Sequence, residues 1–255
     1  MNSLLPSLLT APHYVHQTYM AKFYDDTATL TIIPGGTSHV IAIYGDKITL
    51  DGAPHKDVVL LPQASEAIEI NSTGKSVLLI AQCLALANYY IKDMGTTSPS
   101  GITNINHNLN LDYRQLDKEK HFNRFLRLIT VPEQPPLLDS VLRYIYQASG
   151  CVSTRDIIAR YATTSKVLQR EFQEYINDSP TAYGKKVCFH ACAAELCLKD
   201  KDEPDLTINK YYANKSSFEK AETKYLGEHN KVASLSLLSK KMLRLDYRLT
   251  DYCDV

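Results

Sequence analysis

The stretch 156–183, DIIARYATTSKVLQREFQEYINDSPTAY, decides the fold. It contains a short and a longer segment of helical apolar spacing, separated by a tight polar break. Ser153 and Asp156, three residues apart, are typical of a capping box at the start of the first helix. Ser179-Pro180 is typical of an N-cap followed by proline at the first position of a further helix. The pattern predicts a short helix, a tight turn, a longer helix and then a third helix.

The spacing of apolar residues predicts which faces of these helices are buried. Either Thr164 or Ser165 can cap the second helix. Its buried stripe would be Leu168, Phe172, Tyr175 and Ile176. The third helix would extend to about Leu198 and bury Tyr183, Val187, Ala191 and Ala194.

The same order of elements recurs after a polar break at 199–205. Another short helix and another capped helix are expected there, with Gly227 as the stop signal. The inward residues of the capped helix would be Phe218, Ala221, Tyr225 and Leu226. Two pairs of short and longer helices, joined by one helix, are what a tandem helix-turn-helix module requires.

These residues resemble the DNA-binding region of AraC/XylS-type bacterial transcription regulators. The landmarks Ala159, Leu168-Gln169-Arg170-x-Phe172 and Ser179-Pro180-x-x-Tyr183 fall in the expected order. The stretch 212–227 is similar to the second unit of that family. The resemblance implies two reading helices that enter successive major grooves on one face of the DNA, roughly one helical turn apart.

The N-terminal part of the chain has a different periodicity. From about 14 to 92, apolar residues alternate or occur in short β-branched runs, as at 28–33, 39–44, 58–61 and 76–80. Turn residues separate these runs, which predicts a small sandwich or barrel. Together with 60–63, the stretch 33–46 resembles the small β-barrel, cupin-like sensor domain of some AraC-type regulators.

We therefore predict an α+β protein, with an N-terminal small β-barrel or cupin-like domain followed by an all-α domain of two helix-turn-helix units joined by a linker helix. The expected parts are a β-rich sensor or dimerisation domain (1–95), a helical connector (96–150), the tandem module (151–230) and an amphipathic C-terminal helix (231–255). Pro135-Pro136 would open the connector helix that bears Leu138, Leu142 and Ile145. The apolar stripe of the C-terminal helix consists of Leu235, Leu238, Met242, Leu245 and Leu249. We expect it to fold back on the body rather than to serve as a partner or dimer helix.

Four features depart from the family pattern. The step from Ala159 to Leu168 is one residue short, which predicts a tightened turn. Tyr211 occupies the position of a turn glycine and would be strained if that position needs a positive φ. Glu222 replaces a core aromatic, which costs several kcal/mol unless the carboxylate is paired or rotates out. His229-Asn230 replaces a closing Ser-Pro, so the second unit looks degenerate.

The N-terminal polar faces of the two longer helices carry the candidate DNA-binding residues. The resemblance assigns Ser165, Lys166, Gln169, Arg170 and Gln173 to the first unit. It assigns Asn214, Lys215, Ser216, Ser217 and Lys220 to the second. Arginine and glutamine can read guanine and adenine edges, whereas lysine mostly neutralises phosphate. The alternative is that these are ordinary solvated positions of short helices.

Histidines and cysteines offer a metal interpretation that we do not favour. Cys188 and Cys192 share a helix face, but His190 points elsewhere and a closed zinc site needs four convergent ligands. Buried structural thiols are the preferred interpretation for Cys188, Cys192 and Cys197, with redox sensing as a minor alternative. His13, His16, His39 and His55 lack the cupin metal pattern, and nucleotide-binding and hydrolase motifs are absent. We expect no enzyme activity, no metal and no cofactor.

The composition of the chain is compatible with DNA binding but does not by itself indicate it. The chain has 255 residues, with 28 Lys+Arg against 28 Asp+Glu. That balance excludes histone-like binding. Residues 1–139 nevertheless carry 10 basic and 13 acidic side chains, and 140–255 carry 18 and 15. The basic excess therefore lies with the helix-turn-helix units, mainly the first. No run long enough to span a bilayer and no signal-peptide pattern occurs, so we expect a cytoplasmic protein.

The function implied by the resemblance is a sequence-specific DNA-binding transcription regulator. Its partner would be double-stranded DNA. A small-molecule effector or a protein partner at the N-terminal domain, and a homodimer, are compatible with it, whereas a membrane partner is not expected. The alternative is a regulator-derived protein with a degenerate second unit that acts by protein–protein contact.

Overall fold

The computed structural model describes residues 3–6, 15–24, 27–45, 48–91, 101–105, 127, 137–198 and 204–250, with the backbone alone at 3–6, His16, Asn88 and 246–250. Much of the expected connector (92–100, 106–126 and 128–136) lies outside these ranges. The chain packs into two compact units. Unit 1 takes the described parts of Met1–Leu30, Thr37–Gln63 and Ile68–Gln134, and unit 2 takes those of Thr31–Gly36, Ala64–Ala67 and Pro135–Val255.

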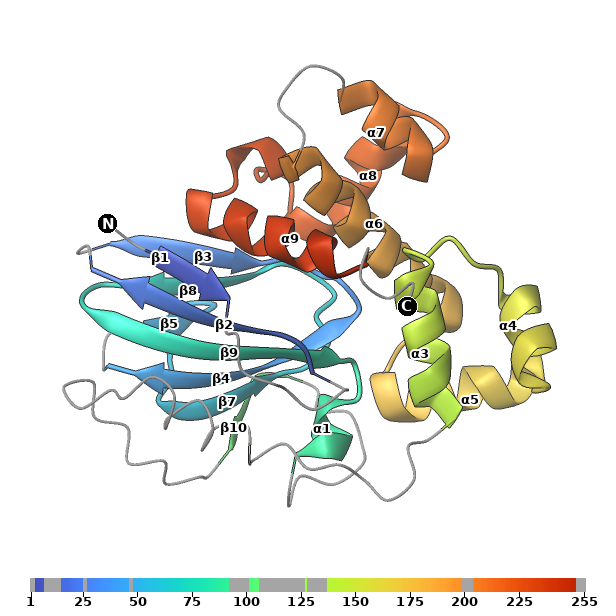
Figure 1. The fold of residues 1–255 in the computed structure, drawn as a ribbon, viewed down its shortest axis with the longest axis horizontal. Helices are drawn as coiled ribbons and strands as arrows, with labels where there is room; N and C mark the ends of the chain where they lie inside the picture. The colour runs from blue at the N-terminus through green and yellow to red at the C-terminus, as the bar shows by residue number, and fades with distance from the viewer. Residues whose placement is uncertain are drawn as a thin grey trace. The chain divides into compact units, whose positions relative to one another are not determined.

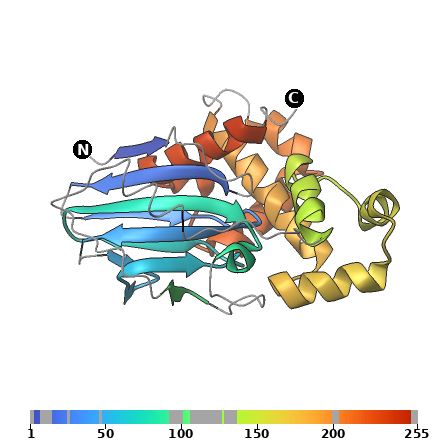
Figure 2. The ribbon, with the colours of Figure 1, turned by 60° about the horizontal axis from the view of Figure 1, so that its bottom comes forward.

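Unit 1 is built from β-strands (Figures 1 and 2). A larger antiparallel sheet has the order β1-β2-β9-β4-β7-β10, and a smaller sheet has the order β3-β8-β5-β6. The strands of the larger sheet are β1 (Ser3–Pro6), β2 (Val15–Phe23), β9 (Ser76–Leu84), β4 (Thr37–Tyr44), β7 (Asp57–Leu61) and β10 (Thr103–Ile105). Those of the smaller sheet are β3 (Ala28–Ile32), β8 (Ile68–Ser72), β5 (Ile48–Leu50) and β6 (Ala53–Pro54). A short helix, α1 (Ala87–Tyr90), follows β9.

The sequence of the central strands explains their position. Every residue of β4 and of β9 is buried, so both faces of these strands are covered. Strands covered on both faces are continuously apolar rather than alternating. The predicted β-rich N-terminal part is confirmed, and in the described residues its strands form two separate hydrogen-bonded sheets rather than one closed barrel.

Unit 2 is helical. Its helices are α3 (Leu137–Gln147), α4 (Thr154–Tyr161), α5 (Ser165–Ile176), α6 (Pro180–Leu198), α7 (Pro204–Tyr211), α8 (Lys215–Leu226), the 3₁₀ turn η2 (Val232–Ser234) and α9 (Leu237–Thr250). In α3, the predicted residues Leu138, Leu142 and Ile145 are buried. No helix in the described residues is long and apolar enough to cross a bilayer.

The central element of unit 2 is α6. Ser179 caps it by accepting a hydrogen bond from the Ala182 N–H at 3.1 Å, as the Ser-Pro pair predicts. Its four predicted inward residues, Tyr183, Val187, Ala191 and Ala194, are all buried. The C-terminal helix α9 packs on α6, with Leu238 and Met242 buried. The expectation that the C-terminal helix folds back on the body is confirmed.

Two early segments of the chain also belong to unit 2. Ile33 lies in its main apolar cluster, and the Tyr183 hydroxyl donates to the Gly36 carbonyl at 2.7 Å. Gly36 has a φ of +73°, and a Cβ there would lie 2.5 Å from Val187 Cγ2. Only glycine fits this backbone and this space. We expected Ile33 and Gly36 in the β-rich domain. A strand pattern does not show which part of the protein the loop after the strand contacts.

Candidate nucleic-acid interface

The first helix-turn-helix unit consists of α4, a turn at 162–164 and α5. The predicted capping box at α4 is present: the Ser153 hydroxyl accepts from the Asp156 N–H, and the Asp156 carboxylate accepts from the Ser153 N–H, each at 3.2 Å. The Ser153 hydroxyl also donates to Asp156 Oδ2 at 2.7 Å, and this hydrogen bond, together with the one from the Ser153 N–H, lowers the pKa of Asp156. Thr164, not Ser165, caps α5 by accepting from the Val167 N–H at 3.3 Å. From the sequence, either Thr164 or Ser165 could cap this helix, and the structure shows that the N-cap is Thr164.

The turn of the first unit is tight, as the short spacing predicts. Ala162 ends α4 in the left-handed conformation, with a φ of 48°. Asn177 ends α5 in the same way, with a φ of 56°. An alanine there is strained, whereas asparagine tolerates this conformation better. The turn of the first unit therefore begins with a left-handed alanine.

The buried side of α5 fixes which face points outward. Leu168, Phe172 and Ile176 are buried, and the Phe172 ring lies edge-to-face with Tyr183 of α6, with centroids 5.7 Å apart. Lys186 of α6 forms an ion pair of 2.8 Å with Asp178, just after α5. These contacts hold α5 on α6 from one side only.

All five predicted DNA-binding residues of the first unit lie on the opposite, exposed side of α5: Ser165, Lys166, Gln169, Arg170 and Gln173. The Gln173 side-chain amide donates to Asn177 Oδ1 at 2.8 Å, so its donor is engaged within the helix end. The structure brings together Lys166, Gln169 and Arg170 on the first two turns of α5, where a reading helix meets base edges.

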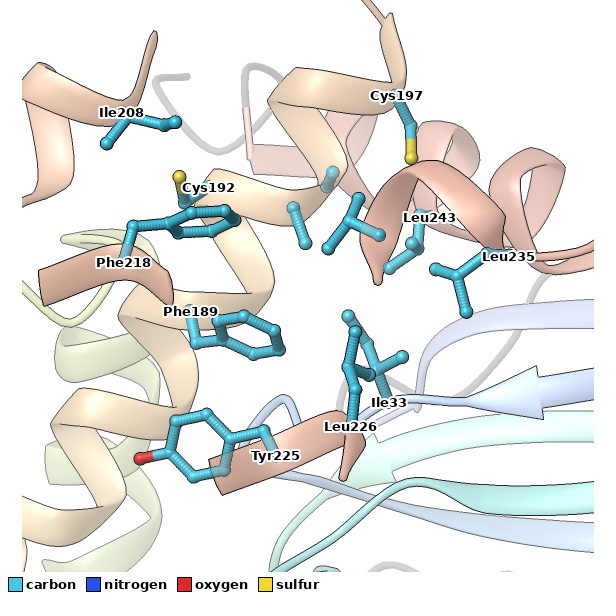
Figure 3. Packing of buried hydrophobic residues seen from close by; sticks show 13 residues of the cluster. Ile33, Phe189, Cys192, Cys197, Ile208, Phe218, Tyr225, Leu226, Leu235 and Leu243 are labelled. Carbon is cyan, nitrogen blue, oxygen red and sulfur yellow. The ribbon is translucent and has the colours of Figure 1, made fainter. Parts of the chain in front are cut away.

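The second unit is a complete helix-turn-helix, consisting of α7, a turn at 212–214 and α8. Asn214 caps α8: its Oδ1 accepts from the Ser217 N–H at 2.9 Å and from the Ser217 hydroxyl at 3.0 Å. The predicted inward residues Phe218, Tyr225 and Leu226 are buried, and Gly227 ends α8. Figure 3 shows Phe218 and Tyr225 around Phe189 of α6; the centroids lie 6.0 and 5.0 Å from that of Phe189.

Tyr211 is not strained. It ends α7, and it is absent from the described residues that have a positive φ. Its hydroxyl donates to Glu195 Oε2 of α6 at 2.9 Å, and Lys210 Nζ lies 2.8 Å from the same oxygen. The glycine of the family pattern is therefore not needed at this site. Glu195, buried in the linker helix, is a contact that the sequence analysis missed, because an acidic residue on a long helix has no pattern that names its partner.

Glu222 is buried, at 6% exposure, and paired. Its Oε1 accepts from the Val232 N–H at 2.8 Å, and its Oε2 lies 3.1 Å from Lys231 Nζ. The carboxylate is paired rather than rotated out, because residues just beyond the helix satisfy both of its oxygens. Asn230, in the replaced Ser-Pro position, donates to the Leu226 carbonyl at 3.1 Å. The second unit is built differently from the family pattern and is not degenerate in its fold.

Four of the five predicted residues of the second unit are exposed: Asn214, Lys215, Ser216 and Lys220. Ser217 is partly buried. Asn214 and Ser217 are engaged in the N-cap, so Lys215, Ser216 and Lys220 are the side chains left to face a ligand. They occupy the first turn and a half of α8.

The charges of unit 2 divide into paired and unpaired groups. Lys186, Lys210 and Lys231 are bound to buried or partly buried carboxylates. Lys166, Arg170, Lys215 and Lys220 form no ion pair within the described residues. The first turns of α5 and α8 hold no acidic residue, whereas those of α4 and α7 hold Asp156 and Asp205. Helix N-termini without carboxylates attract anions such as phosphate.

The cysteines and histidines behave mainly as packing residues. Cys192 and Cys197 belong to the apolar cluster of unit 2, seen in Figure 3. Burial lowers the pKa of His190 to about 4. His39 is buried in β4, and His55 Nδ1 lies 3.2 Å from Asn104 Oδ1.

The candidate metal ligands divide into residues that the structure describes and residues that it does not. His13 lies outside the described residues, and of His16 only the backbone is described. Within the described ranges, no group of three His, Cys, Asp or Glu side chains has the arrangement to hold a metal ion.

The β-sheet unit, the helical unit and the two helix-turn-helix pairs joined by α6 together define the fold of AraC-type regulators, as the resemblance implied. Solved structures of ToxT from Vibrio cholerae have this fold. A 1.65 Å structure is 11% identical over 86% of this chain and 98% of that chain, with a TM-score of 0.50.

A structure of ToxT from strain O395 is 12% identical over 89% of this chain and 98% of that chain, with a TM-score of 0.50. A third, of ToxT bound to (E)-4-(8-methylnaphthalen-1-yl)but-3-enoic acid, is 10% identical with the same coverage and TM-score. At this identity the likeness establishes the fold. No protein-family model and no curated sequence matches the chain.

Proposed function

We propose that the protein is a sequence-specific DNA-binding transcription regulator, and that α5 and α8 are its reading helices. The observation that carries the proposal is the pair of complete helix-turn-helix units on α6. In each, the second helix is capped by a side chain, is buried on one face, and exposes polar residues on its first turns. That is the geometry with which a recognition helix enters a major groove.

The electrostatics support the same two helices. Lys186, Lys210 and Lys231 are held in internal ion pairs, whereas Lys166, Arg170, Lys215 and Lys220 on the first turns of α5 and α8 form none within the described residues and can bind an external anion. Arg170 and Gln169 supply the bidentate donors that read purine edges, and the lysines supply phosphate contacts. Both units contribute two cations, so we assign DNA binding to both rather than to the first alone.

The alternative is a protein that acts only by protein–protein contact. Its sequence basis was the altered second unit, with Tyr211 and Glu222 in place of family residues. In the structure both residues form specific internal contacts and α8 keeps its exposed polar turn. We therefore rank DNA binding first.

A salt-dependent gel shift on the DNA upstream of the protein's own gene tests the proposal. We expect binding at low salt that the Lys166→Ala, Arg170→Ala double variant weakens by about 10- to 100-fold, since a good bidentate contact contributes about 1–3 kcal/mol and a phosphate contact adds to it. The double variant Lys56→Ala, Lys75→Ala, which removes two exposed cations of unit 1, is the matched control. Absence of any low-salt shift, or equal binding by the two double variants, overturns the proposal.

We further propose that unit 1 binds a small amphipathic acid that controls DNA binding. ToxT has been solved with such an acid. In this chain, a buried polar row crosses the large sheet: Tyr19 Oη donates to Gln82 Oε1 at 3.4 Å, and Gln82 Nε2 donates to Thr37 Oγ1 at 3.3 Å. Such a row amid apolar strands offers polar groups to one end of an amphipathic ligand.

The same butenoic acid is the probe for this second part. We expect it to raise the melting temperature of the full chain and to change the gel shift, and we expect Gln82→Leu to remove both effects. A Gln82→Leu variant that still responds to the acid would place the ligand elsewhere.

A further inference from the structure

Cys188 of α6 lies at the junction of the two helix-turn-helix units. Its thiol donates to the Tyr211 carbonyl, with the sulfur 3.7 Å from the oxygen. The Tyr212 hydroxyl lies near the same thiol, and burial together with Cys188 raises the pKa of Tyr212. Both tyrosines belong to the end of α7 and the turn that leads into α8. The thiol is therefore part of the support of the second unit.

The turn that precedes the first unit lies on the same part of α6. Gly150 has a φ of +75°, and a Cβ on it would lie 2.1 Å from the Gly184 carbonyl oxygen and 2.7 Å from the Cys188 nitrogen. Only a glycine can approach the backbone of α6 this closely. Cys151 is the next residue and is exposed; it adjoins Gly150, whose added Cβ would lie 3.1 Å from Cys188 Cβ, and burial together with the neighbouring Cys151 raises the pKa of Cys188.

We propose that Cys151 and Cys188 form an oxidisable pair, in which an intramolecular disulfide joins the turn before α4 to the linker helix and weakens the support of α7 and α8. The pair places one solvent-accessible thiol against one half-buried thiol, which is the arrangement of an attacking and a resolving cysteine. Neither cysteine is part of a disulfide in this structure.

The oxidant in this reaction is hydrogen peroxide. The Cys151 thiolate attacks one peroxide oxygen, so that the O–O bond breaks, a sulfenic acid forms and one water leaves. The Cys188 sulfur then attacks the Cys151 sulfur and displaces the hydroxyl as a second water. Two thiols lose two hydrogens and two electrons in total, and one hydrogen peroxide is reduced to two waters.

The disulfide has a consequence for the second unit because a disulfide sulfur carries no hydrogen. The donor to the Tyr211 carbonyl is lost, and the contact with Tyr212 changes. This part of the inference rests on the proposed function, since its readout is DNA affinity. We expect oxidised protein to bind DNA about two- to thirteenfold more weakly, the effect of one net hydrogen bond of about 0.5–1.5 kcal/mol.

Burial and the neighbouring Cys151 raise the pKa of the Cys188 thiol to about 12. Since the thiolate is the nucleophile in the second step, disulfide formation accelerates as pH rises from 7 toward 9. Cys192, one helical turn from Cys188, is fully buried among Phe189 and Phe218 and is not expected to compete.

Peptide mapping of the full chain after treatment with hydrogen peroxide tests the bond itself. We expect tryptic peptides 144–155 and 187–199 to be joined through Cys151 and Cys188, and the link to be absent in Cys151→Ser. Cys253→Ser, an equal sulfur-to-oxygen change, is the control that should keep it. Oxidation of Cys151 to sulfinic acid without the link, or a link from Cys151 to Cys192 or Cys197, overturns the pair.

A gel shift of the same samples tests the coupling. We expect peroxide to weaken binding by the parent chain and by Cys253→Ser, with recovery after a dithiol reductant, but not by Cys151→Ser. If the peptides are linked but DNA binding is unchanged, the disulfide forms and its proposed effect on DNA affinity is wrong. If the reduced chain does not bind DNA, the proposed function fails, and the peptide map still decides the disulfide.

Discussion

The side chain of Glu222 in α8 accepts a hydrogen bond at 2.8 Å from the backbone N–H of Val232 in η2. A buried carboxylate in an apolar cluster is costly unless it is paired. Here the polypeptide directly after α8 supplies one backbone donor and, through Lys231, one cation. The segment that follows the second unit is therefore part of that unit's structure.

We expect Glu222→Ala to lower the free energy of unfolding by about 2–3 kcal/mol, because it leaves the Val232 N–H without its acceptor in a buried place. Glu222→Gln keeps an acceptor oxygen and should cost only about 1 kcal/mol. Lys231→Ala, at a half-exposed position, should cost less than about 1 kcal/mol. Urea unfolding of the three variants measures this order, and an Ala variant as stable as the parent would contradict it.

Gly36 offers a test of the early segment in unit 2. We expect Gly36→Ala to lower stability by about 2–4 kcal/mol, because the alanine adopts a positive φ and its Cβ meets Val187. Gly52 is a matched control, since its φ is +79° and a Cβ there meets nothing within 4 Å. Gly52→Ala should cost only the backbone share, about 1 kcal/mol. Equal losses in the two variants would mean that Gly36 does not pack as described.

His190 should make stability fall in acid. Burial lowers its folded-state pKa to about 4, below the ordinary value of 6.5 in the unfolded chain. Between these values the unfolded state binds a proton that the folded state does not. Stability is therefore greatest above the unfolded pKa and declines as pH falls from about 6.5 to about 4.

We expect this residue to account for a loss of about 2–3 kcal/mol between about pH 7 and pH 4.5. His190→Leu removes the titrating group, so the difference between its pH profile and that of the parent isolates the effect. Parallel profiles in urea unfolding would show that His190 is not buried as a neutral ring.

The salt dependence of DNA binding should show whether the second unit contacts phosphates in addition to the first. If α8 contacts phosphates through Lys215 and Lys220, their joint replacement by alanine lowers the slope of log K against log salt by about 1.8. A plain loss of fold would reduce affinity without this change in slope, and circular dichroism checks for it. An unchanged slope would restrict phosphate contact to α5.

The sequence predicted the helices of unit 2 well, because caps and stripes such as Ser153 with Asp156, or Leu168 with Phe172, are local signals. It also predicted the candidate DNA-binding residues by resemblance, and the structure exposes all of them except Ser217. The contacts of Tyr211 and Glu222 could not be predicted from the sequence. Both depend on partners in other elements, Glu195 and Val232, and only three-dimensional packing decides whether an unusual residue is a defect or a replacement.

Unit 2 is assembled from separate stretches of the sequence, and this affects when it can fold. The Thr31 N–H donates to Ser239 Oγ across 208 residues of sequence, and Tyr183 reaches Gly36 across 147. During synthesis, residues 31–36 and 64–67 leave the ribosome long before α6 and α9 exist. Loop closure over such separations is slow, so the helical unit is completed only after α6 and α9 have been made.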